Sequence, residues 1–575
     1  MEATYRGAYN FEKELEKIKM HVQTFDDNIK GKTTNDSNTE NVCRIHVHCR
    51  VFDWKQPPNK NNGSSGTGTG FVINHPIFNT EDDTIYILTA HHVISNAIQV
   101  SVKFTKLSSE DIKATIVGCN PEMDVSIISI KHKDIKNKIK GFDIDNSDEI
   151  NALEEVKAIG FALGKEHLQT TQGVISGRIS NPSRLQTTVD VNPGNSGGPL
   201  LNSVNKIVGI VTSGLTNANG IYYAAPIEES MIIFKRMLTS TTKLEYPLTA
   251  EGSVIDYLPS LNSTFTKCND VLLKSFDIKS EDCNFGIYCT SVHPFIEYPQ
   301  SLEEAISNLS KYSDNTLSTL CIEYLKSLKE INKTFSKCNW KKLLLHEFSL
   351  KDSNQLLDFI RNNTLKQGDI VCSMKVDDNV YKIDTKMNTQ FNFWSDKILF
   401  YSILDRLEVG NSIEFEIYRK NSNIHNVKVP LLKNLDIFKE MHSETENVPY
   451  LALGGVIVMP LLHNHIPLFK NNSMLSLMNN PHSSHKSMLL ITHILPESPF
   501  NKTESIHAGD ILVAINQKSV DTLQSLSSEW KNETKKQKSI TLHMRDGSLS
   551  TANIESLNDA EEIIGKEYSS GFVKH

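Results

Sequence analysis

The chain has 575 residues, and this length predicts about three or four domains. Its net charge is −8, with acidic and basic residues mixed along the sequence, and the lack of a concentrated basic region argues against a nucleic-acid partner. No stretch reaches the roughly 18 apolar residues of a membrane span, and the N-terminus lacks the apolar core of a signal peptide. The nine cysteines are odd in number and scattered, which favours reduced thiols. We therefore expect an intracellular protein, with the cytoplasm favoured, and no membrane contact.

The first expected element is a helix over residues 8–30. Its apolar residues recur at alternating steps of four and three, which is typical of a helix with an apolar seam: Phe11, Leu15, Ile18, Val22, Phe25 and Ile29. The seam needs a partner, and two remain open: the body of the same chain or a second copy of it. Residues 30–41 are rich in Thr, Asn, Asp and Ser and are expected to link this helix to the first strand.

A strand with two cysteines and two histidines comes next: Cys43, His46, His48 and Cys49. Successive side chains of a strand point to opposite faces, so the two histidines lie opposite the two cysteines. A tetrahedral metal site needs its ligands to converge on one point. We therefore expect no metal at this strand.

Two later segments offer a base and an acid. Residues 86–90 are largely apolar and predict a strand that runs into His91 and His92, where an imidazole would be held by the strand and still face a cleft. Asp124 stands at the start of a second apolar segment, from which its carboxylate could orient an imidazole. A lone histidine at a strand end is more often structural, so a catalytic role for it requires a nucleophile elsewhere in the chain.

The most informative segment is 190–200, with the sequence Asp-Val-Asn-Pro-Gly-Asn-Ser-Gly-Gly-Pro-Leu. A serine hydroxyl becomes a strong nucleophile when a base removes its proton, and the oxyanion that then forms needs N–H donors. Gly194 allows a turn that aims its own amide and that of Ser196 at one point. The alternative is a plain Gly/Pro/Asn surface turn. A histidine, an aspartate and this motif, in that order, favour a serine protease.

Together these residues resemble the HtrA/Deg family of trypsin-like serine proteases. The family's Thr-x-x-His-Val pattern falls on Thr89–Val93 and selects His92 as the base, Asp124 matches the orienting acid, and residues 192–199 match the nucleophile motif. The resemblance implies a catalytic triad and an oxyanion hole, made by His92, Asp124 and Ser196 and by Gly194, Asn195 and Ser196 respectively. It implies neither a metal nor an organic cofactor.

The resemblance covers roughly residues 43–240 and implies two small antiparallel barrels with the cleft between them. Residues 64–73 match as the strand opening the first barrel, and residues 160–161 and 172–176 match as a strand pair before the nucleophile. HtrA proteases usually form trimers, so a homo-oligomer is expected, with the helix over 8–30 at its interface if that helix does not dock on its own chain. The bacterial family members act outside the cytoplasm, and the location expected here departs from theirs.

Beyond about residue 250, two segments resemble PDZ domains. Residues 490–499 and 507–516 give a strand, a Pro-marked turn, and a Gly-Asp turn that feeds the next strand, and residues 286–294 and 365–372 repeat this pattern. In a PDZ domain an extended peptide adds as a strand at an exposed edge. We place the peptide-binding loop of the second module, with a plain buried strand as the alternative, at Leu451, Ala452, Leu453, Gly454 and Gly455.

A long insertion separates the two halves of the first PDZ-like module. Apolar residues at helical spacing between 317 and 331, followed by leucine clusters, predict an inserted helical bundle over about residues 296–364. Residues 393–400 and 450–457 resemble plant and eukaryotic Deg proteases.

The expected fold is therefore multidomain, an all-β chymotrypsin-like double barrel followed by two α+β PDZ-like domains. The boundaries are 1–42 for the helix and linker, 43–240 for the protease, 250–435 for the first PDZ-like domain with its insertion, and 445–560 for the second. The resemblance implies an ATP-independent serine endopeptidase that cleaves unfolded or flexible protein segments in protein quality control. The alternative is a catalytically silent PDZ scaffold or holdase on a protease fold.

One position departs from the family pattern. HtrA proteases usually have a small apolar residue six positions before the nucleophile and an acid two positions earlier, and here these positions hold Asp190 and Thr188. In trypsin-type enzymes an aspartate at the first of these positions lies at the base of the specificity pocket, so Asp190 would favour Lys or Arg before the cut. Alternatively, Asp190 points away and takes over the structural hydrogen bonds of the missing acid.

Overall fold

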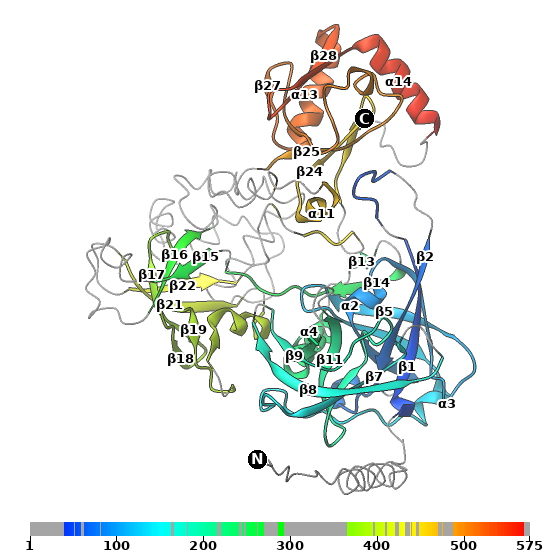
Figure 1. Ribbon diagram of the computed structural model, residues 1–575, viewed down its shortest axis with the longest axis vertical. Helices are drawn as coiled ribbons and strands as arrows, with labels where there is room; N and C mark the ends of the chain where they lie inside the picture. The colour runs from blue at the N-terminus through cyan, green and yellow to red at the C-terminus, as the bar shows by residue number, and fades with distance from the viewer. Residues whose placement is uncertain are drawn as a thin grey trace, which may run out of the picture.

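The computed structural model describes residues 39–268, 286–292 and 365–567, apart from short loop segments within these ranges (Figure 1). The helix expected over residues 8–30 and the insertion expected over 296–364 lie outside the described residues. The domain boundaries given above stay predictions.

The first barrel is built from six antiparallel strands. They are β1 (Val42–Cys49), β2 (Ser64–Phe71), β3 (Thr84–Thr89), β4 (Ala97–Lys103), β5 (Ile112–Asn120) and β6 (Val125–Lys131). Neighbours follow the order β5-β4-β1-β2-β3-β6, and a further pairing of β5 with β6 closes the ring. Residues 64–73 therefore supply the second strand of the barrel rather than the one that opens it. Alternate side chains, among them Ile45, Ile87 and Val102, fill the interior.

The second barrel is a closed six-stranded ring in the order β10-β11-β12-β9-β8-β7. Its strands are β7 (Glu155–Gly160), β8 (Gln169–Ile179), β9 (Arg184–Thr187), β10 (Pro199–Asn202), β11 (Ile207–Gly214) and β12 (Tyr222–Pro226). The expected double barrel is thereby confirmed. The predicted strand pair before the nucleophile is β7 with β8, which pair from Glu155 opposite Val174 to Gly160 opposite Gln169.

The segment that leaves the second barrel returns to the first. Helix α4 (Ile227–Thr239) is followed by β13 (Leu244–Tyr246) and β14 (Thr249–Ile255), and β14 pairs in parallel with the C-terminal half of β5. The partners are Val254 with Gly118 and Ile255 with Cys119, and the amide of Asp256 continues the ladder to the Cys119 carbonyl at 2.9 Å. The connection to the rest of the chain is thus a strand of the first barrel's sheet.

Two further sheets follow, and we name them the middle module and the C-terminal module. The middle module has strands β15 (Ser263–Lys267), β16 (Ile287–Val292), β17 (Ile370–Val376), β18 (Asn379–Lys382), β19 (Asn388–Thr389), β20 (Ile398–Leu399), β21 (Ser412–Tyr418) and β22 (His425–Pro430), with the 3₁₀ helix η4 (Phe400–Arg406) after β20. Its main sheet has the order β15-β16-β17-β21-β22.

The C-terminal module is a seven-stranded sheet with two helices. Its strands are β23 (Leu451–Leu453), β24 (Val456–Pro460), β25 (Leu489–Ile494), β26 (Ile511–Ile515), β27 (Lys518–Ser519), β28 (Ser539–Met544) and β29 (Leu549–Asn553). Helices α13 (Leu523–Lys536) and α14 (Ile554–Glu567) lie with them at one end of the molecule (Figure 1). A short helix, α11 (Ile466–Phe469), precedes β25.

The two modules share one hydrogen-bonded turn, as the repeated Gly-Asp pattern predicts. In the middle module the Gly368 amide donates to the Cys289 carbonyl at 3.0 Å, and the Cys289 amide donates to the Asp369 carbonyl at 2.8 Å. Gly509, Ile491 and Asp510 make the same pair of bonds in the C-terminal module, at 2.8 and 2.9 Å. Each aspartate carboxylate also accepts the amide three residues before it. The two turns are therefore structurally equivalent.

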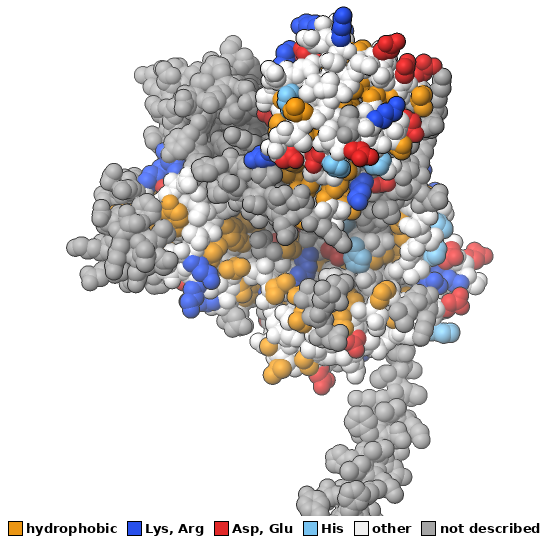
Figure 2. Space-filling view, turned by 45° about the horizontal axis from the view of Figure 1, so that its top comes forward, with side chains coloured by type: hydrophobic (Ala, Val, Ile, Leu, Met, Phe, Trp, Pro, Cys, Tyr) orange, Lys and Arg blue, Asp and Glu red, His pale blue; other side chains and the backbone are white. Residues whose placement is uncertain are grey.

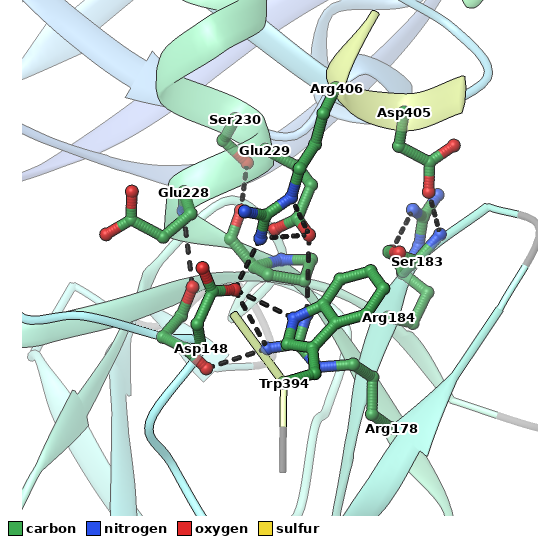
Figure 3. Close-up of polar contacts among 12 residues, drawn as sticks. Asp148, Arg178, Ser183, Arg184, Glu228, Glu229, Ser230, Trp394, Asp405 and Arg406 are labelled. Carbon is green, nitrogen blue, oxygen red and sulfur yellow. Dashed lines mark hydrogen bonds and ion pairs between the residues drawn. The ribbon is translucent and has the colours of Figure 1, made fainter. Parts of the chain in front are cut away.

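The middle module packs on the second barrel through four buried charges that form one cluster: Asp148, Arg178, Glu229 and Arg406. Figure 3 shows Arg406 of η4 reaching Asp148 and Glu229, and its Nη2 lies 2.9 Å from Glu229 Oε1. Arg178 of β8 approaches the same Glu229 oxygen at 3.4 Å, and the Trp394 indole donates to Asp148 at 2.9 Å. The Glu229 side chain is 0% exposed, so its charge depends on these guanidinium groups.

The loop after β1 contacts the C-terminal module. Gln56 Nε2 lies 3.0 Å from His493 Nε2, and the Trp54 ring meets His465 edge to face with centroids 5.9 Å apart. Burial lowers the pKa of His465 to about 4, so this ring is neutral at pH 7. On the face in Figure 2, the described Lys and Arg side chains are interspersed with Asp and Glu.

Asp405 gives the contact between the middle module and the second barrel a pH dependence. Its side chain accepts the Ser183 amide at 2.6 Å, the residue is 2% exposed, and burial raises its pKa to about 6. An unfolded aspartate has a pKa of about 3.9. Because the folded protein holds this proton more tightly, the stability from Asp405 is fully present below about pH 4 and is lost as the pH rises through about 6.

We predict that Asp405→Asn changes this pH dependence, because asparagine keeps an acceptor for the Ser183 amide and carries no charge. The variant's Tm relative to wild type should be higher at pH 7.5 than at pH 4.5, by roughly 2–6 °C. Differential scanning calorimetry of both full-length proteins at the two pH values measures this. An equal Tm difference at both pH values would contradict the assignment.

Candidate active site

His92 stands where β3 gives way to a single helical turn, α2 (His91–Ile94). Val93 and Ile94 are buried in the first barrel and anchor this turn. The His91 side chain is buried, whereas the His92 side chain is 46% exposed. Of the two histidines, His92 is therefore the one that an incoming group can reach.

His92 and Asp124 form a two-point contact. The His92 Nδ1 atom lies 2.8 Å from Asp124 Oδ2 and donates to it, because a carboxylate can only accept. The backbone amide of His92 donates to the other oxygen, Oδ1, also at 2.8 Å. Burial acts to raise the pKa of Asp124, but these hydrogen bonds and the nearby imidazole hold it below its ordinary value. The carboxylate is therefore ionised at neutral pH, and it leaves Nε2 as the free ring nitrogen.

The backbone of Asp124 is in the left-handed region, with φ of +52°. This conformation is uncommon for residues other than glycine, but aspartate adopts it more readily than most because its short side chain can form local hydrogen bonds. The Asp124 amide donates to the Pro121 carbonyl at 3.2 Å, and the Met123 amide donates to the Asn120 side chain at 2.7 Å. These bonds close the turn between β5 and β6, which we name the acid turn (residues 120–124).

The nucleophile motif forms a turn that packs on β2. The Thr69 amide donates to the Ser196 carbonyl at 3.0 Å, and the Thr69 hydroxyl donates to the Gly194 carbonyl at 2.6 Å. Gly194 has φ of +103°. Within the described residues, the hydrogen bonds of this turn leave the amides of Gly194 and Ser196 without a protein acceptor. These two amides are candidates to bind an oxyanion, whereas the amide of Asn195, the third residue of the expected oxyanion hole, donates to the Asn192 carbonyl at 3.0 Å.

The nucleophile turn lies directly against the segment that carries the base. A Cβ at Gly197, where φ is +81°, would sit 2.1 Å from the Thr89 hydroxyl and 2.9 Å from the Ala90 amide. The Ser196 hydroxyl donates to the Thr212 carbonyl at 3.2 Å, and no hydrogen bond joins it to His92 in the described part of the chain. Such catalytic bonds are often long before a substrate binds.

Asp190 is exposed and has two partners. Its carboxylate accepts the Tyr222 hydroxyl at 3.1 Å, and its carbonyl accepts the Thr171 hydroxyl at 3.0 Å. Burial and the hydrogen bond with Asp190 raise the pKa of Tyr222. Thr188 stands at the position where the family has an acid, and its hydroxyl accepts the Val174 amide at 3.0 Å.

The segment that we expect to bind peptides forms the hairpin of β23 and β24. Leu453 pairs with Val456, so Gly454 and Gly455 make a two-residue turn with φ of +56° and +81°. Leu451 and Leu453 are buried, and the Gly454 amide donates to Glu561 of α14 at 3.2 Å.

Among the described residues, no three His, Cys, Asp or Glu side chains gather in a way that could hold a metal ion.

The supporting roles of three residues are not visible in the sequence. Thr69 joins β2 to the nucleophile turn, Thr89 donates to the Thr69 carbonyl at 2.8 Å, and Asn120 closes the acid turn. Thr89 and Asn120 lie inside segments that the motifs single out, but their roles depend on strand neighbours that are distant in the sequence. These roles become visible only when the pairing of the strands is known.

We predict that Gly197→Ala lowers kcat/KM on a denatured protein by roughly 100-fold or more, because the new Cβ must displace Thr89 or the backbone before His92. Gly547→Ala is the matched control, since Gly547 has φ of +92° with nothing within 4 Å of its Cβ position. The control should keep wild-type kcat/KM. Equal activity of the two variants would show that the close approach at Gly197 does not matter.

Comparisons with known proteins agree with this geometry. Residues 68–210 match the trypsin-like peptidase domain family, and residues 475–545 match the PDZ domain family. The chain is 30% identical over 208 residues to the putative serine protease HhoB of Synechocystis sp., which covers 34% of this chain and 46% of HhoB. It is 35% identical over 182 residues to a probable periplasmic serine endoprotease DegP-like of Pseudomonas fluorescens, covering 30% of this chain and 35% of that protein.

The serine protease Do-like HtrA of Bacillus subtilis is 31% identical over 211 residues, or 34% of this chain and 44% of that protein. The chain spans less than half the length of each of these curated relatives. A solved structure of the HtrA-type protease AlgW with a tripeptide has a TM-score of 0.41 and 17% identity, covering 69% of this chain and 95% of that chain.

One expectation needs correction. Several Pseudomonas relatives are named periplasmic endoproteases, a location reached by export, and on this comparison the expectation of an intracellular protein is wrong. Within the described residues, no helix has the length and apolar character that crossing a membrane requires. The predicted resemblance is confirmed: this chain contains a trypsin-like peptidase domain and a PDZ domain and is similar to the serine proteases named DegP and HtrA.

Proposed function

We propose that this protein is an HtrA/Deg-type serine endopeptidase that cleaves unfolded or flexible protein segments without ATP. The observation that carries the proposal is the two-point contact of His92 with Asp124, at 2.8 Å for both bonds. That contact sets the tautomer in which Nε2 can accept a proton. The nucleophile turn packs against the backbone just before His92 and carries two amides free for an oxyanion.

The reaction follows from these positions. His92 Nε2 takes the proton of the Ser196 hydroxyl as the oxygen attacks the substrate carbonyl, and the amides of Gly194 and Ser196 stabilise the oxyanion. Asp124 stabilises the imidazolium, which then protonates the leaving amine. Water hydrolyses the acyl-enzyme by the same steps. For the reaction to begin, the Ser196 hydroxyl must leave the Thr212 carbonyl and turn to His92.

The middle module and the C-terminal module are proposed to bind substrate peptides or to assist assembly. A non-catalytic scaffold is the competing function, and the hydrogen bond from Ser196 to Thr212 in place of His92 is the observation that favours it. The two functions differ in the reactivity of one hydroxyl.

We predict that a fluorophosphonate probe labels wild-type protein at Ser196, because an activated serine displaces the probe's fluoride. Ser196→Ala should lose labelling and lower casein cleavage by roughly 10⁴-fold or more. Ser203→Ala, in an exposed turn between β10 and β11, is the matched control and should behave as wild type. Casein cleavage by purified Ser196→Ala would refute the triad, and a wild-type protein that neither labels nor cleaves would support the scaffold.

For substrate choice, we propose that Asp190 favours Lys or Arg before the cut. The exposed carboxylate lies on the segment that leads into the nucleophile and is held by the Tyr222 hydroxyl. A charged pair in a partly desolvated pocket contributes more than a neutral contact.

Cleavage-site profiling on a denatured proteome tests this idea. Wild-type cuts should follow Lys or Arg, and Asp190→Ala should lower kcat/KM for such sites by roughly 10-fold or more relative to apolar sites. Tyr222→Phe keeps the carboxylate and should keep the preference. Dominance of Val, Ala or Leu before the cut, unchanged in Asp190→Ala, would refute basic specificity and leave the triad assignment untouched.

A further inference from the structure

Arg184 contacts the acid turn from the other barrel. It is the first residue of β9, and its Nη2 atom donates to the Glu122 carbonyl at 3.0 Å, while Nη1 lies 3.0 Å from the Met123 sulfur. Met123 is fully buried and directly precedes Asp124. The guanidinium therefore braces the two residues before Asp124, although it forms no hydrogen bond with Asp124 itself.

The middle module in turn holds Arg184. The Ser183 carbonyl accepts Arg184 Nη1 at 2.9 Å, and the Ser183 amide donates to Asp405 at 2.6 Å (Figure 3). Asp405 belongs to η4, so a side chain of the middle module fixes the backbone from which Arg184 extends.

A second path runs from the same short segment to the other end of the acid turn. Arg236 of α4 donates to the Leu407 carbonyl at 3.0 Å and forms a two-point ion pair with Asp256, at 3.0 and 2.7 Å. Asp256 accepts the Asn120 side-chain amide at 3.0 Å, and Asn120 holds the Met123 amide. Residues 405 and 407 thus reach both ends of the acid turn.

We propose that Arg184 is a positioning residue for the catalytic acid, and that Asp405 of the middle module keeps it in place. The inference rests on the proposed function of the triad. A guanidinium suits the role because it stays charged and its donors have a fixed geometry. Without it, the left-handed turn at Asp124 loses its bond across the barrels, and the carboxylate moves away from His92.

Several charged groups lie near Arg184 and Asp124 and would also be affected by a substitution of Arg184. Arg184 faces Asp124, Asp405 and Glu229, and Asp124 faces His92 and the neighbouring His91. Losing the carboxylate from His92 removes the acceptor of its Nδ1 proton, so the ring is no longer held in the tautomer that leaves Nε2 free. A residue that supports only folding would leave this tautomer unchanged.

The test compares Arg184→Met with Arg178→Met. Arg178 is also largely buried and lies on β8. Its hydrogen-bond, ion-pair and ring partners among the described residues are Ser147, Asp148, Glu229 and Trp394, and it also lies near Arg406 and Asp405, but none of these residues is in the acid turn. Arg184→Lys keeps the charge with a different donor geometry and should give an intermediate effect. It also serves as the second variant if Arg184→Met does not fold.

The first measurement is the pH dependence of kcat/KM on casein, whose acid limb reports the base in the free enzyme. Arg184→Met should lower kcat roughly 10- to 100-fold and displace the acid limb from its wild-type position, while Arg178→Met keeps the wild-type limb. A folded Arg184→Met protein with the wild-type limb overturns the inference. An equal shift in Arg178→Met does so as well.

The second measurement does not depend on activity. In the Ser196→Ala background, the Nδ1 proton of His92 is observed by NMR, with its resonance assigned by its loss in His92→Gln. Adding Arg184→Met should shift or remove this resonance, because the proton loses its carboxylate acceptor, and adding Arg178→Met should leave it unchanged. If wild-type protein is not labelled by fluorophosphonate, the proposed function fails, and this resonance still decides the role of Arg184.

Discussion

The left-handed backbone at Asp124 is the constraint on which the candidate active site depends. It turns the carboxylate so that both oxygens meet His92, one at the ring and one at the backbone amide. A positive φ is uncommon for residues other than glycine, although aspartate adopts it more readily than most. The turn is closed by Asn120 within the first barrel and braced by Arg184 from the second, so the geometry of one side chain depends on both barrels and on what supports them.

The contact between the middle module and the protease is polar and buried, and this has a physical cost. Glu229 and Asp405 are removed from water, and their desolvation is offset only where guanidinium and amide donors meet them with good geometry. Apolar packing would tolerate small shifts of one domain on another, whereas buried charges must keep their donors within hydrogen-bond distance. An interface of this kind favours one orientation of the middle module on the protease over other, slightly rotated orientations.

The sequence predicts those parts of the site that are local in the chain. His92 and Ser196 each stand in a segment whose composition indicates its role, and the apolar residues of β3 and β6 predict the strands that hold His92 and Asp124. The Gly-Asp turns of the two modules are equally local, and the structure gives them the same hydrogen bonds. Arg184 and Asp405 carry no such signal, and the matched segment that contains Thr69 does not show its role, because these roles arise from contacts between segments far apart in the sequence. The register of paired strands and the docking of modules are tertiary properties that no short motif encodes.

The strand β14 has a consequence for how this chain divides into units. One edge of β5 is shared: its N-terminal half pairs with β4 and its C-terminal half with β14, which arrives only after the second barrel is complete. A fragment that stopped at residue 240 would leave backbone groups of Gly118 and Cys119 open at a sheet edge, next to the acid turn. The segment that leads to the later modules is therefore also a strand of the first barrel's sheet. A hinge motion of the middle module would have to begin beyond Asp256, or it would break the hydrogen bonds between β14 and β5.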